Sequence, residues 1–492
     1  MNAYETLAAR NKRLSALKNA LGILHWDQET MMPPAAAPSR AEVFAELGVM
    51  AHEISTLDDT SDLLADADQQ DDLDVWQRAN LREIRHAYLH ANAVPAELVK
   101  HIEIARSEST MVWREARPKN DFAALAPKLD KLFGLIREQA TVKSEAMNVT
   151  PYESLLDEYD PGRREAQVDA IFTDLESFLP GFLQKVMQKQ AAAPAAVMPP
   201  GPFAQADQEN LSREVLKILD FPFERGRLDT AAHPFSGGAD GDRRITTRYE
   251  DDDFTKSLMA VIHETGHALY QDGLPKQWQG QPVGNHRGMT VHESQSLLLE
   301  MQAARSEQFI RFLSSVLKTQ MRGTGSAWEP NNILRLYRKV EPGLIRVYAD
   351  EVTYPLHVIL RYKMEKSILA GDITTSDLPH AWNESMKNTL GIEPPNDTDG
   401  VMQDVHWPAG IFGYFPTYSL GAMAAAQIFK TATNANTEIA PALGRGEFKP
   451  LYNWLSDNIR SQGCLLMPDE LIEQATGAPL GTEAYKASIT ER

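Results

Sequence analysis

The first 190 residues show the spacing of hydrophobic positions that is typical of amphipathic helices. From Tyr4 to about Gln190, apolar side chains recur every three or four residues, as in LDVWQRANLREIRHAYLHANA and FAALAPKLDKLFGLIREQATVKSEAM. Residues at this spacing lie on one face of a helix and bury that face against neighbouring elements. We therefore predict an all-helical layer for this part of the chain.

The second half of the chain is predicted to combine helices with a little β-structure. The predicted helices cover about 208–219, the segment through His263 and His267, about 291–318 and about 344–369. We expect Pro355 to kink the last helix, because proline removes a backbone donor and clashes with the preceding turn. Between 225 and 253, two short runs of β-forming residues flank turns rich in Gly and Asp, which favours a small β-ribbon. The predicted fold class is mostly α with a minor sheet.

Length and linker composition favour one large body. The chain has 492 residues, which is enough for several domains. Only the stretch AAAPAAVMPPGPF, ending at Phe203, has the Pro- and Ala-rich composition of a surface linker. We expect a single domain over residues 1–492, with a sub-boundary near 191–207 between the N-terminal helical layer and the rest.

Charge and hydropathy exclude two kinds of partner. With 49 Lys and Arg against 68 Asp and Glu, the formal net charge is −19, which repels nucleic acid and anionic lipid. No run of 18 apolar residues occurs, so no membrane-spanning helix is predicted. We expect a globular protein that binds neither nucleic acid nor membrane.

Cysteine usage and the first residues favour a cytoplasmic location. The single cysteine, Cys464, cannot form an internal disulfide or a Cys-based zinc finger. Charged residues such as Glu5, Arg10 and Lys18 interrupt the zone where a signal peptide needs a continuous apolar run. We therefore expect the protein in the cytoplasm.

The segment LMAVIHETGHALYQ carries a HExxH motif on a predicted helix. His263 and His267 lie four residues apart, so both imidazoles can reach one Zn²⁺, and Glu264 is turned towards the substrate side as a general base. A random chain of this composition would contain the motif only about 0.02 times. Gly266 costs about 1 kcal/mol relative to Ala inside a helix, which indicates that another segment packs closely against it.

A catalytic zinc needs a third protein ligand and an open fourth position. The extended pattern HExxHxxGxxH is not met, because Tyr270 and Gly273 stand where Gly and His are required. The following helical segment, VHESQSLLLEMQAARSEQ, offers Glu293 and Glu300. Spacing favours Glu293, and Glu300 on a neighbouring face of the same helix is the alternative.

Six motifs follow one another along the chain: HPF at 233–235, DRRIT at 242–246, HETGH at 263–267, HESQ at 292–295, IRVYAD at 345–350 and GVMQDVHW at 400–407. They resemble those of the carboxypeptidase Taq family, which contains zinc metallocarboxypeptidases of the thermostable carboxypeptidase 1 type. The stretch LHWDQETMMP near His25 is similar to the N-terminal signature of the family. The resemblance spans most of the chain.

The resemblance implies a large, helical, gluzincin-type metallopeptidase fold with a deep central groove and a small β-ribbon near the active site. It implies one Zn²⁺ per chain held by His263, His267 and Glu293, with Co²⁺ able to substitute, and Glu264 as general base and acid. It also implies a homodimer. The expected substrates are peptides with a free C-terminus, which lose single residues with broad side-chain preference and poor action beside proline.

Hydrolysis of a peptide bond also requires donors that stabilise the tetrahedral oxyanion. The stretch HWPAGIFGYFPTYSLG supplies His406, Tyr414 and Tyr418. By similarity to related zinc oligopeptidases, we expect His406 and Tyr414 to act as these donors, with Tyr418 in reserve as a substrate-binding residue. The alternative is that these aromatic side chains only pack the wall of the groove.

A carboxypeptidase must also bind the terminal carboxylate of its substrate. A planar guanidinium binds a carboxylate in a bidentate manner, as Lys cannot. Arg346 in IRVYAD is the first candidate and Arg244 in DRRIT the second. His233 precedes a proline, which favours extended backbone, and we expect it at the rim of the cleft among the substrate-binding residues.

Several further polar residues have weaker signals. Asp350 and Asp404 are candidates to orient an imidazole or an arginine near the metal, although helix-surface charges would look the same. The remaining histidines, including His86 and His90, receive no function from the sequence.

Two other functions share part of this pattern. A zinc endo-oligopeptidase or an aminopeptidase uses the same HExxH-plus-Glu chemistry, but no GxMEN-like anionic motif for a peptide amine lies near the zinc helix. A catalytically silent peptide-binding protein with a structural metal would have no use for Glu264. The sequence therefore favours a carboxypeptidase, with the carboxylate-binding arginine as the discriminating residue.

Overall fold

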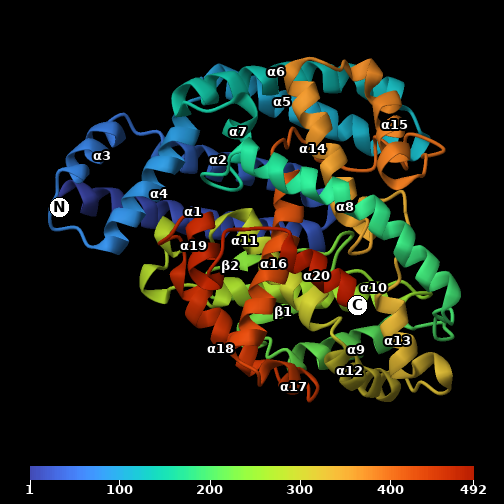
Figure 1. The fold of residues 1–492 in the computed structure, drawn as a ribbon. Coiled ribbons are helices and arrows are strands. Elements are labelled where there is room, and N and C mark those ends of the chain that lie inside the picture. The colour runs from blue at the N-terminus through green and yellow to red at the C-terminus, as the bar shows by residue number, and fades with distance from the viewer.

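The computed structural model describes residues 1–492, and helices make up most of it (Figure 1). The N-terminal half contains α1 (Ala3–Thr30), α2 (Ala37–Ser55), α3 (Thr60–Asp68), α4 (Val75–Asn92), α5 (Ala96–Ala116), α6 (Phe122–Met147), α7 (Pro151–Leu156) and α8 (Glu165–Ala192). Side-chain caps fix several starts: Asn2 accepts from the amide of Glu5 at α1, and Asp74 accepts from that of Gln77 at α4. The predicted N-terminal helical layer is confirmed.

The second half of the chain is also helical. It contains α9 (Gln205–Ile218), α10 (Phe254–Asp272), α11 (Gly288–Leu297), α12 (Glu307–Gln320), α13 (Pro330–Tyr337), α14 (Tyr354–Ala370), α15 (Leu378–Leu390), α16 (Phe415–Ala435), α17 (Ile439–Leu443), α18 (Lys449–Asn458), α19 (Pro468–Thr476) and α20 (Glu483–Glu491). Figure 1 shows α14 and α15, drawn in orange, beside α5 and α6, although the segments are far apart in sequence. None of these helices is long and apolar enough to cross a membrane.

The sheet has one more strand than the predicted ribbon. It contains β1 (Gly226–Thr230), β2 (Ser236–Ala239) and β3 (Asp242–Thr247), in the order β1-β3-β2. β2 and β3 form an antiparallel pair, as in a β-ribbon, whereas β1 adds to the other edge of β3 in parallel. Leu228 and Ile245 are register partners and pack against Val261 and Ala268 of α10, which explains why β1 joins the sheet.

Two predicted helices differ from the structure. The predicted helix over 291–318 is divided, because the chain forms a π-helical turn over Leu298–Ala303 and Ser306 then caps a new helix, α12. Pro355 does not kink a helix. It lies in the first turn of α14, where its missing N–H would have no partner anyway, so it begins the helix instead of bending it.

One hydrophobic core holds most of the chain together. A cluster of 81 buried residues runs from Val94 to Ile489 and includes residues on both sides of 191–207, so the linker there does not divide the core. A smaller cluster joins α1, α3 and α4 and consists of Tyr4, Leu7, Leu64, Ala67, Leu73, Leu81 and Ile84. The N-terminal helices therefore have some core of their own but are packed onto the main body.

Candidate active site

The HETGH motif lies in the middle of α10. The amide of Thr255 donates to the Asp253 side chain, which caps the helix, and the apolar face beyond it is buried. The rings of His263 and His267 lie on one face with their centroids 4.9 Å apart. Helical spacing thus presents two imidazoles to a common point, as the motif predicts.

Two glycines allow α11 to approach from the side. A Cβ on Gly266 would lie 2.5 Å from the carbonyl oxygen of Gln295 and 2.5 Å from Cα of Ser296, both in α11. A Cβ on Gly421 in α16 would lie 2.8 Å from Cβ of Glu293. The close neighbour that Gly266 predicts is therefore α11, the helix that carries Glu293.

This packing brings the three candidate metal ligands together. Oε2 of Glu293 lies 3.3 Å from Nε2 of His267 and 3.8 Å from Nε2 of His263, and one ligand atom from each residue lies within 4.8 Å of the others. The opposite ring nitrogens are engaged: Nδ1 of His263 lies 2.9 Å from Glu300, and Nδ1 of His267 lies 3.2 Å from the carbonyl of His292. Two oriented imidazoles and a carboxylate form a donor set that fits Zn²⁺.

Glu300 orients a ligand in this arrangement. Its carboxylate lies between Nδ1 of His263 and Nη2 of Arg305, which is 2.5 Å away. Burial opposes its ionisation, but Arg305 and His263 lower the pKa of Glu300 to about 2. Burial also opposes the charged form of His263 and so lowers its pKa. Glu293 and Glu300 outweigh this effect and raise the pKa of His263 to about 10. The cluster thus attracts positive charge strongly.

Glu264 is buried beside these ligands, with 6% of its surface exposed. Burial raises the pKa of its carboxyl, partly offset by the two neighbouring imidazoles. A carboxylate with a raised pKa accepts a proton more readily than an exposed one, as a general base must.

An aromatic group carries the residues expected to contact the reacting carbonyl. Nε2 of His406 lies 3.3 Å from the hydroxyl of Tyr418, and the Tyr414 and Tyr418 rings are 5.1 Å apart. Burial lowers the pKa of His406 to about 4 and raises the pKa of Tyr418 to about 12, so both are neutral at pH 7. The structure thus brings together the three aromatic candidates as potential hydrogen-bond donors.

Arg346 belongs to a buried charge cluster next to these aromatic residues. Its Nε and Nη2 donate to Oδ1 of Asp404, and Nε of Arg361 donates to Oδ2. The Arg346 guanidinium also lies over the ring of Tyr418, with 4.8 Å between the guanidinium carbon and the ring centroid. Two arginines against one aspartate leave one net positive charge here. Asp404 therefore orients arginines, one of the two roles considered for it.

Arg244 and His233 lie in the sheet region, and Arg244 contacts the N-terminal helix. The Arg244 side chain pairs with Asp242 and lies 4.3 Å from the ring centroid of Trp26, within the LHWDQE stretch of α1. His233 is exposed between β1 and β2. The contacts of these side chains are thus separate from the three candidate metal ligands.

No sequence pattern points to Glu365, which holds in place the segment that carries His406 and Tyr414. This carboxylate is fully buried in α14 and accepts hydrogen bonds from Nε1 of Trp407, the amide of Gly413 and the hydroxyl of Tyr152. Burial raises its pKa to about 7. Its only sequence feature is a charged residue between apolar positions of a predicted helix. An exposed glutamate gives the same pattern, so burial could not be predicted.

A helix bearing HExxH, with a glutamate supplied by the next helix inside a mostly helical body, defines a metallopeptidase. The sequence profile of the carboxypeptidase Taq (M32) metallopeptidase family matches residues 6–492. The chain belongs to this family.

Relatives with assigned names agree with this assignment. The chain is 35% identical to thermostable carboxypeptidase 1 of Thermus thermophilus, over 100% of this chain and 98% of that protein. It is 33% identical to carboxypeptidase 1 of Bacillus subtilis, over 95% and 93% of the two chains. Both resemble this chain along almost their whole length.

Solved structures show the same fold. Metallocarboxypeptidase 1 of Trypanosoma cruzi superposes with a TM-score of 0.97 at 40% identity and 99% coverage of both chains. The carboxypeptidase of Pyrococcus furiosus superposes with a TM-score of 0.93 at 31% identity, covering 100% of this chain and 99% of that one. The predicted mostly helical metallopeptidase fold is confirmed.

Proposed function

We propose that this protein is a zinc-dependent carboxypeptidase that removes single residues from the C-termini of peptides. Membership of a metallocarboxypeptidase family makes it a peptidase with a metal ion. The observation that carries the finer proposal is the convergence of His263, His267 and Glu293 beside the buried Glu264. Broad side-chain preference and poor action beside proline belong to the same proposal and rest on the family resemblance.

The metal would be held by Nε2 of His263, Nε2 of His267 and a carboxylate oxygen of Glu293. Imidazole nitrogens with a single carboxylate suit Zn²⁺, and Co²⁺ accepts the same donors. When bound, such an ion supplies Lewis-acid polarisation of the scissile carbonyl and of a water molecule. Glu300 keeps the His263 ring in the orientation that turns Nε2 towards the other ligands.

Glu264 moves the proton. Its carboxylate accepts a proton from the attacking water and then passes that proton to the nitrogen of the departing amino acid. The raised pKa caused by burial suits both halves of this task, because the group must hold the proton between the two steps.

His406 and Tyr414 donate to the oxyanion, and Tyr418 holds His406 in place. The depressed pKa of His406 keeps its imidazole neutral, and the raised pKa of Tyr414 keeps its hydroxyl protonated, so neither donor is lost at neutral pH. Buried neutral donors need little reorganisation as negative charge develops on the carbonyl oxygen.

Arg346 binds the terminal carboxylate of the peptide. The net positive charge of the Arg346–Asp404–Arg361 cluster attracts this anion, and Asp404 engages Nε and Nη2, which leaves Nη1 for substrate. Arg244 and His233 contribute farther along the peptide, near the sheet. This assignment distinguishes a carboxypeptidase from an endopeptidase with the same metal chemistry.

Mass spectrometry of two matched peptides tests the proposal. Each peptide is blocked at its N-terminus, and one copy has a free C-terminus while the other is amidated. We expect a ladder of single-residue losses from the free copy and none from the amidated copy. Internal cleavage of both peptides would identify an oligopeptidase and remove the role of Arg346.

Assembly and location complete the proposal. We infer a homodimer from the family resemblance, and a cytoplasmic location from the lone Cys464, which is buried and free. Light scattering coupled to size-exclusion chromatography checks the dimer, for which a mass of about twice the 54.9 kDa of one chain is expected.

A further inference from the structure

A second group of metal-type ligands lies outside the active site. His86 and His90 project from α4 four residues apart, and Asp157 directly follows α7. Nε2 of His86 lies 2.6 Å and Nε2 of His90 lies 3.0 Å from the same oxygen of Asp157, Oδ2. One ligand atom from each side chain lies within 4.8 Å of the others. This group has the same i, i+4 histidine spacing as HETGH, although the sequence assigned it no function.

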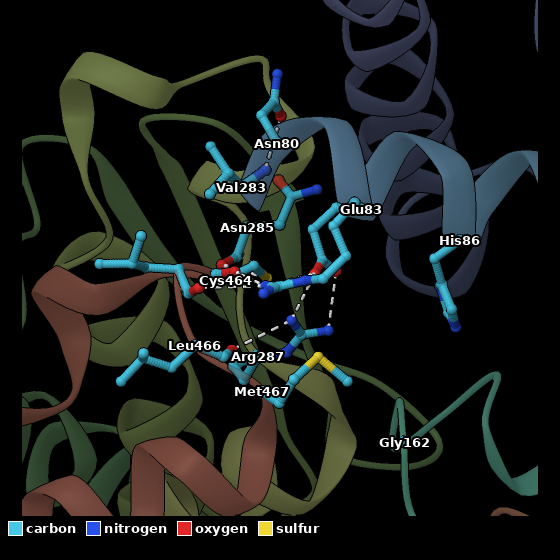
Figure 2. A network of polar contacts seen from close by, with 12 residues as sticks. Asn80, Glu83, His86, Gly162, Val283, Asn285, Arg287, Cys464, Leu466 and Met467 are labelled. Carbon is cyan, nitrogen blue, oxygen red and sulfur yellow. Dashed lines mark hydrogen bonds and ion pairs between the residues drawn. The ribbon is translucent and has the colours of Figure 1, made fainter. Parts of the chain in front are cut away.

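The turn after Asp157 fixes the direction of its carboxylate. Its other oxygen, Oδ1, accepts a hydrogen bond of 2.7 Å from the amide of Gly162. This bond leaves Oδ2 for the two imidazoles. Figure 2 shows His86 projecting from α4 beyond Glu83, with the turn that carries Gly162 nearby. The site is therefore built by two separate elements.

Exposure and charge both favour a cation at this place. The Asp157 and His90 side chains are 7% and 11% exposed, whereas His86 is 29% exposed and gives access from solvent. Burial and then the nearby cation Lys143 lower the pKa of the His90 imidazole, but Lys143 is already paired with Glu158 at 2.8 Å. Asp157 is paired with no Lys or Arg, and its Oδ2 contacts only the two imidazoles.

We propose that His86, His90 and Asp157 bind a second divalent transition-metal ion. With metal–ligand bonds of about 2.1 Å, neighbouring ligand atoms lie about 3 Å apart in an octahedral site and about 3.4 Å apart in a tetrahedral one, so the imidazoles need to move from Oδ2 by less than about 1 Å. Imidazole donors favour Zn²⁺, Co²⁺ or Ni²⁺ over Mg²⁺ and Ca²⁺, and water fills the remaining positions. The ion replaces the protons that the imidazoles otherwise share with Oδ2.

The ion would connect the N-terminal helices to the active-site wall. Tyr159, two residues after Asp157, packs edge-on against Tyr414 with ring centroids 4.9 Å apart. The carbonyl of Tyr159 accepts from the amide of Met289, in the first turn of α11. A cation at Asp157 therefore holds the turn that supports both Tyr414 and the helix of Glu293. Its role is structural, distinct from the chemistry at HETGH.

Metal stoichiometry at equilibrium tests this site. The full-length protein is dialysed against buffered micromolar Zn²⁺, and bound zinc is counted by mass spectrometry. We expect two ions per chain in the wild type, one in His86→Gln, one in His263→Gln and none in the double variant. His101→Gln, which removes an exposed histidine of α5, is the matched control and should keep two.

Thermal unfolding gives a second readout that does not depend on activity. Zn²⁺ should raise the Tm of His263→Gln, in which only the second site remains, and should leave the Tm of the double variant unchanged. Because His86 is partly exposed, its replacement is expected to fold, and Asp157→Asn provides an independent variant. A single ion per chain in the wild type, or unchanged stoichiometry in His86→Gln, would overturn the proposal.

Discussion

Two glycine residues determine how closely the candidate metal ligands approach one another. Gly266 lets the backbone of α11 lie against α10, and Gly421 lets the side chain of Glu293 pass α16. In both cases the neighbour is backbone or the first carbons of a side chain, which cannot move away without moving the ligand. The HETGH motif alone is therefore insufficient, because the third ligand depends on small residues on both adjoining helices.

Replacement of Gly421 by alanine tests this dependence. The new Cβ would lie 2.8 Å from Cβ and 2.9 Å from Cγ of Glu293, so Glu293 must shift away from His263 and His267. We expect zinc affinity to fall by about 10- to 100-fold, as for other changes around metal ligands. Competition with a chromophoric chelator measures this affinity.

Gly134→Ala is the matched control, because a Cβ at Gly134 in α6 meets no atom within 4 Å. This variant should keep wild-type zinc affinity and gain stability of about 0.5–1 kcal/mol from the better helix former. Equal zinc affinity in the two variants would refute the role given to Gly421.

Among single residues, the sequence indicated the candidate metal ligands more readily than the residues that surround them. The HETGH motif and helical spacing indicated His263, His267 and Glu293, with Glu300 as the alternative third ligand, because these residues are close in the chain or fall on consecutive helices. The structure brings the first three together. Glu365 could not be found in this way. Its partners are Tyr152, Trp407 and Gly413, and such contacts across long stretches of chain leave no local pattern.

At the scale of elements, Glu365 connects α14 to the segment between His406 and Tyr414. It accepts from the Trp407 indole and from the Gly413 amide, and so holds both ends of this segment. We expect Glu365→Gln to lower kcat more than it changes KM, because an amide cannot accept from all three donors at once. Steady-state kinetics at equal metal content checks this split, and unaltered kcat would count against the positioning role.

The pKa of Glu365 also predicts a pH dependence of stability. Burial raises this pKa from 4.5 to about 7, so the folded protein favours the protonated carboxyl. The stability that this group contributes is full below about pH 4.5 and is lost as the pH rises to about 7, on the order of 3 kcal/mol in total. Glu365→Gln should therefore be less destabilising at pH 8 than at pH 5.

Urea unfolding of both proteins at the two pH values measures the difference. Comparison with the variant cancels the titration of groups shared by both chains. A destabilisation that is the same at pH 5 and pH 8 would mean that Glu365 does not titrate in this range.

Element boundaries were the part of the fold that hydrophobic spacing predicted least well. The apolar pattern continues through Leu298–Ala303, so the π-helical turn there and the new start at Ser306 were invisible to it. The position of Pro355 was mispredicted for the same reason. Hydrophobic spacing does not show where the helix begins, and so it does not show whether the proline lies in the first turn or inside the helix. The π-helical turn packs against α10 and α16, and hydrophobic periodicity does not record such contacts.

At the scale of the whole molecule, a buried ion pair attaches the N-terminal helices to the active-site body. Glu83 of α4 accepts two hydrogen bonds from Arg287, at 2.8 and 2.9 Å, and Arg287 immediately precedes α11 (Figure 2). The side chains are 10% and 2% exposed. Next to this pair, Asn80 accepts from the amide of Val283. The N-terminal layer thus contacts the chain just before the helix of Glu293.

Removal of one partner should destabilise the whole molecule. Glu83→Gln leaves the Arg287 charge buried without compensation, which costs about 3–5 kcal/mol in comparable pairs. Asp59→Asn, which removes the exposed partner of Arg10 between α1 and α3, is the control and should leave stability near that of the wild type. Urea unfolding measures both, and similar losses in the two variants would contradict the role of the buried pair.

The overall architecture was predictable because its class depends on composition and periodicity summed over many residues. The way that α4 docks on the main body was not, because Glu83 and Arg287 are 204 residues apart and each looks like an ordinary charged residue. The same holds for the cluster of His86, His90 and Asp157, in which Asp157 lies far from the two histidines in the sequence. Polar contacts between residues far apart in the chain therefore could not be predicted from this sequence.

Glu264 is proposed to transfer a proton beside a metal held by three other residues. The most direct test is kcat of Glu264→Gln for a peptide with a free C-terminus, measured on protein whose catalytic zinc content equals that of the wild type. Loss of the general base predicts a fall in kcat of about 10²- to 10⁴-fold while the metal stays bound. Near-normal turnover by this zinc-loaded variant would show that Glu264 is not the general base.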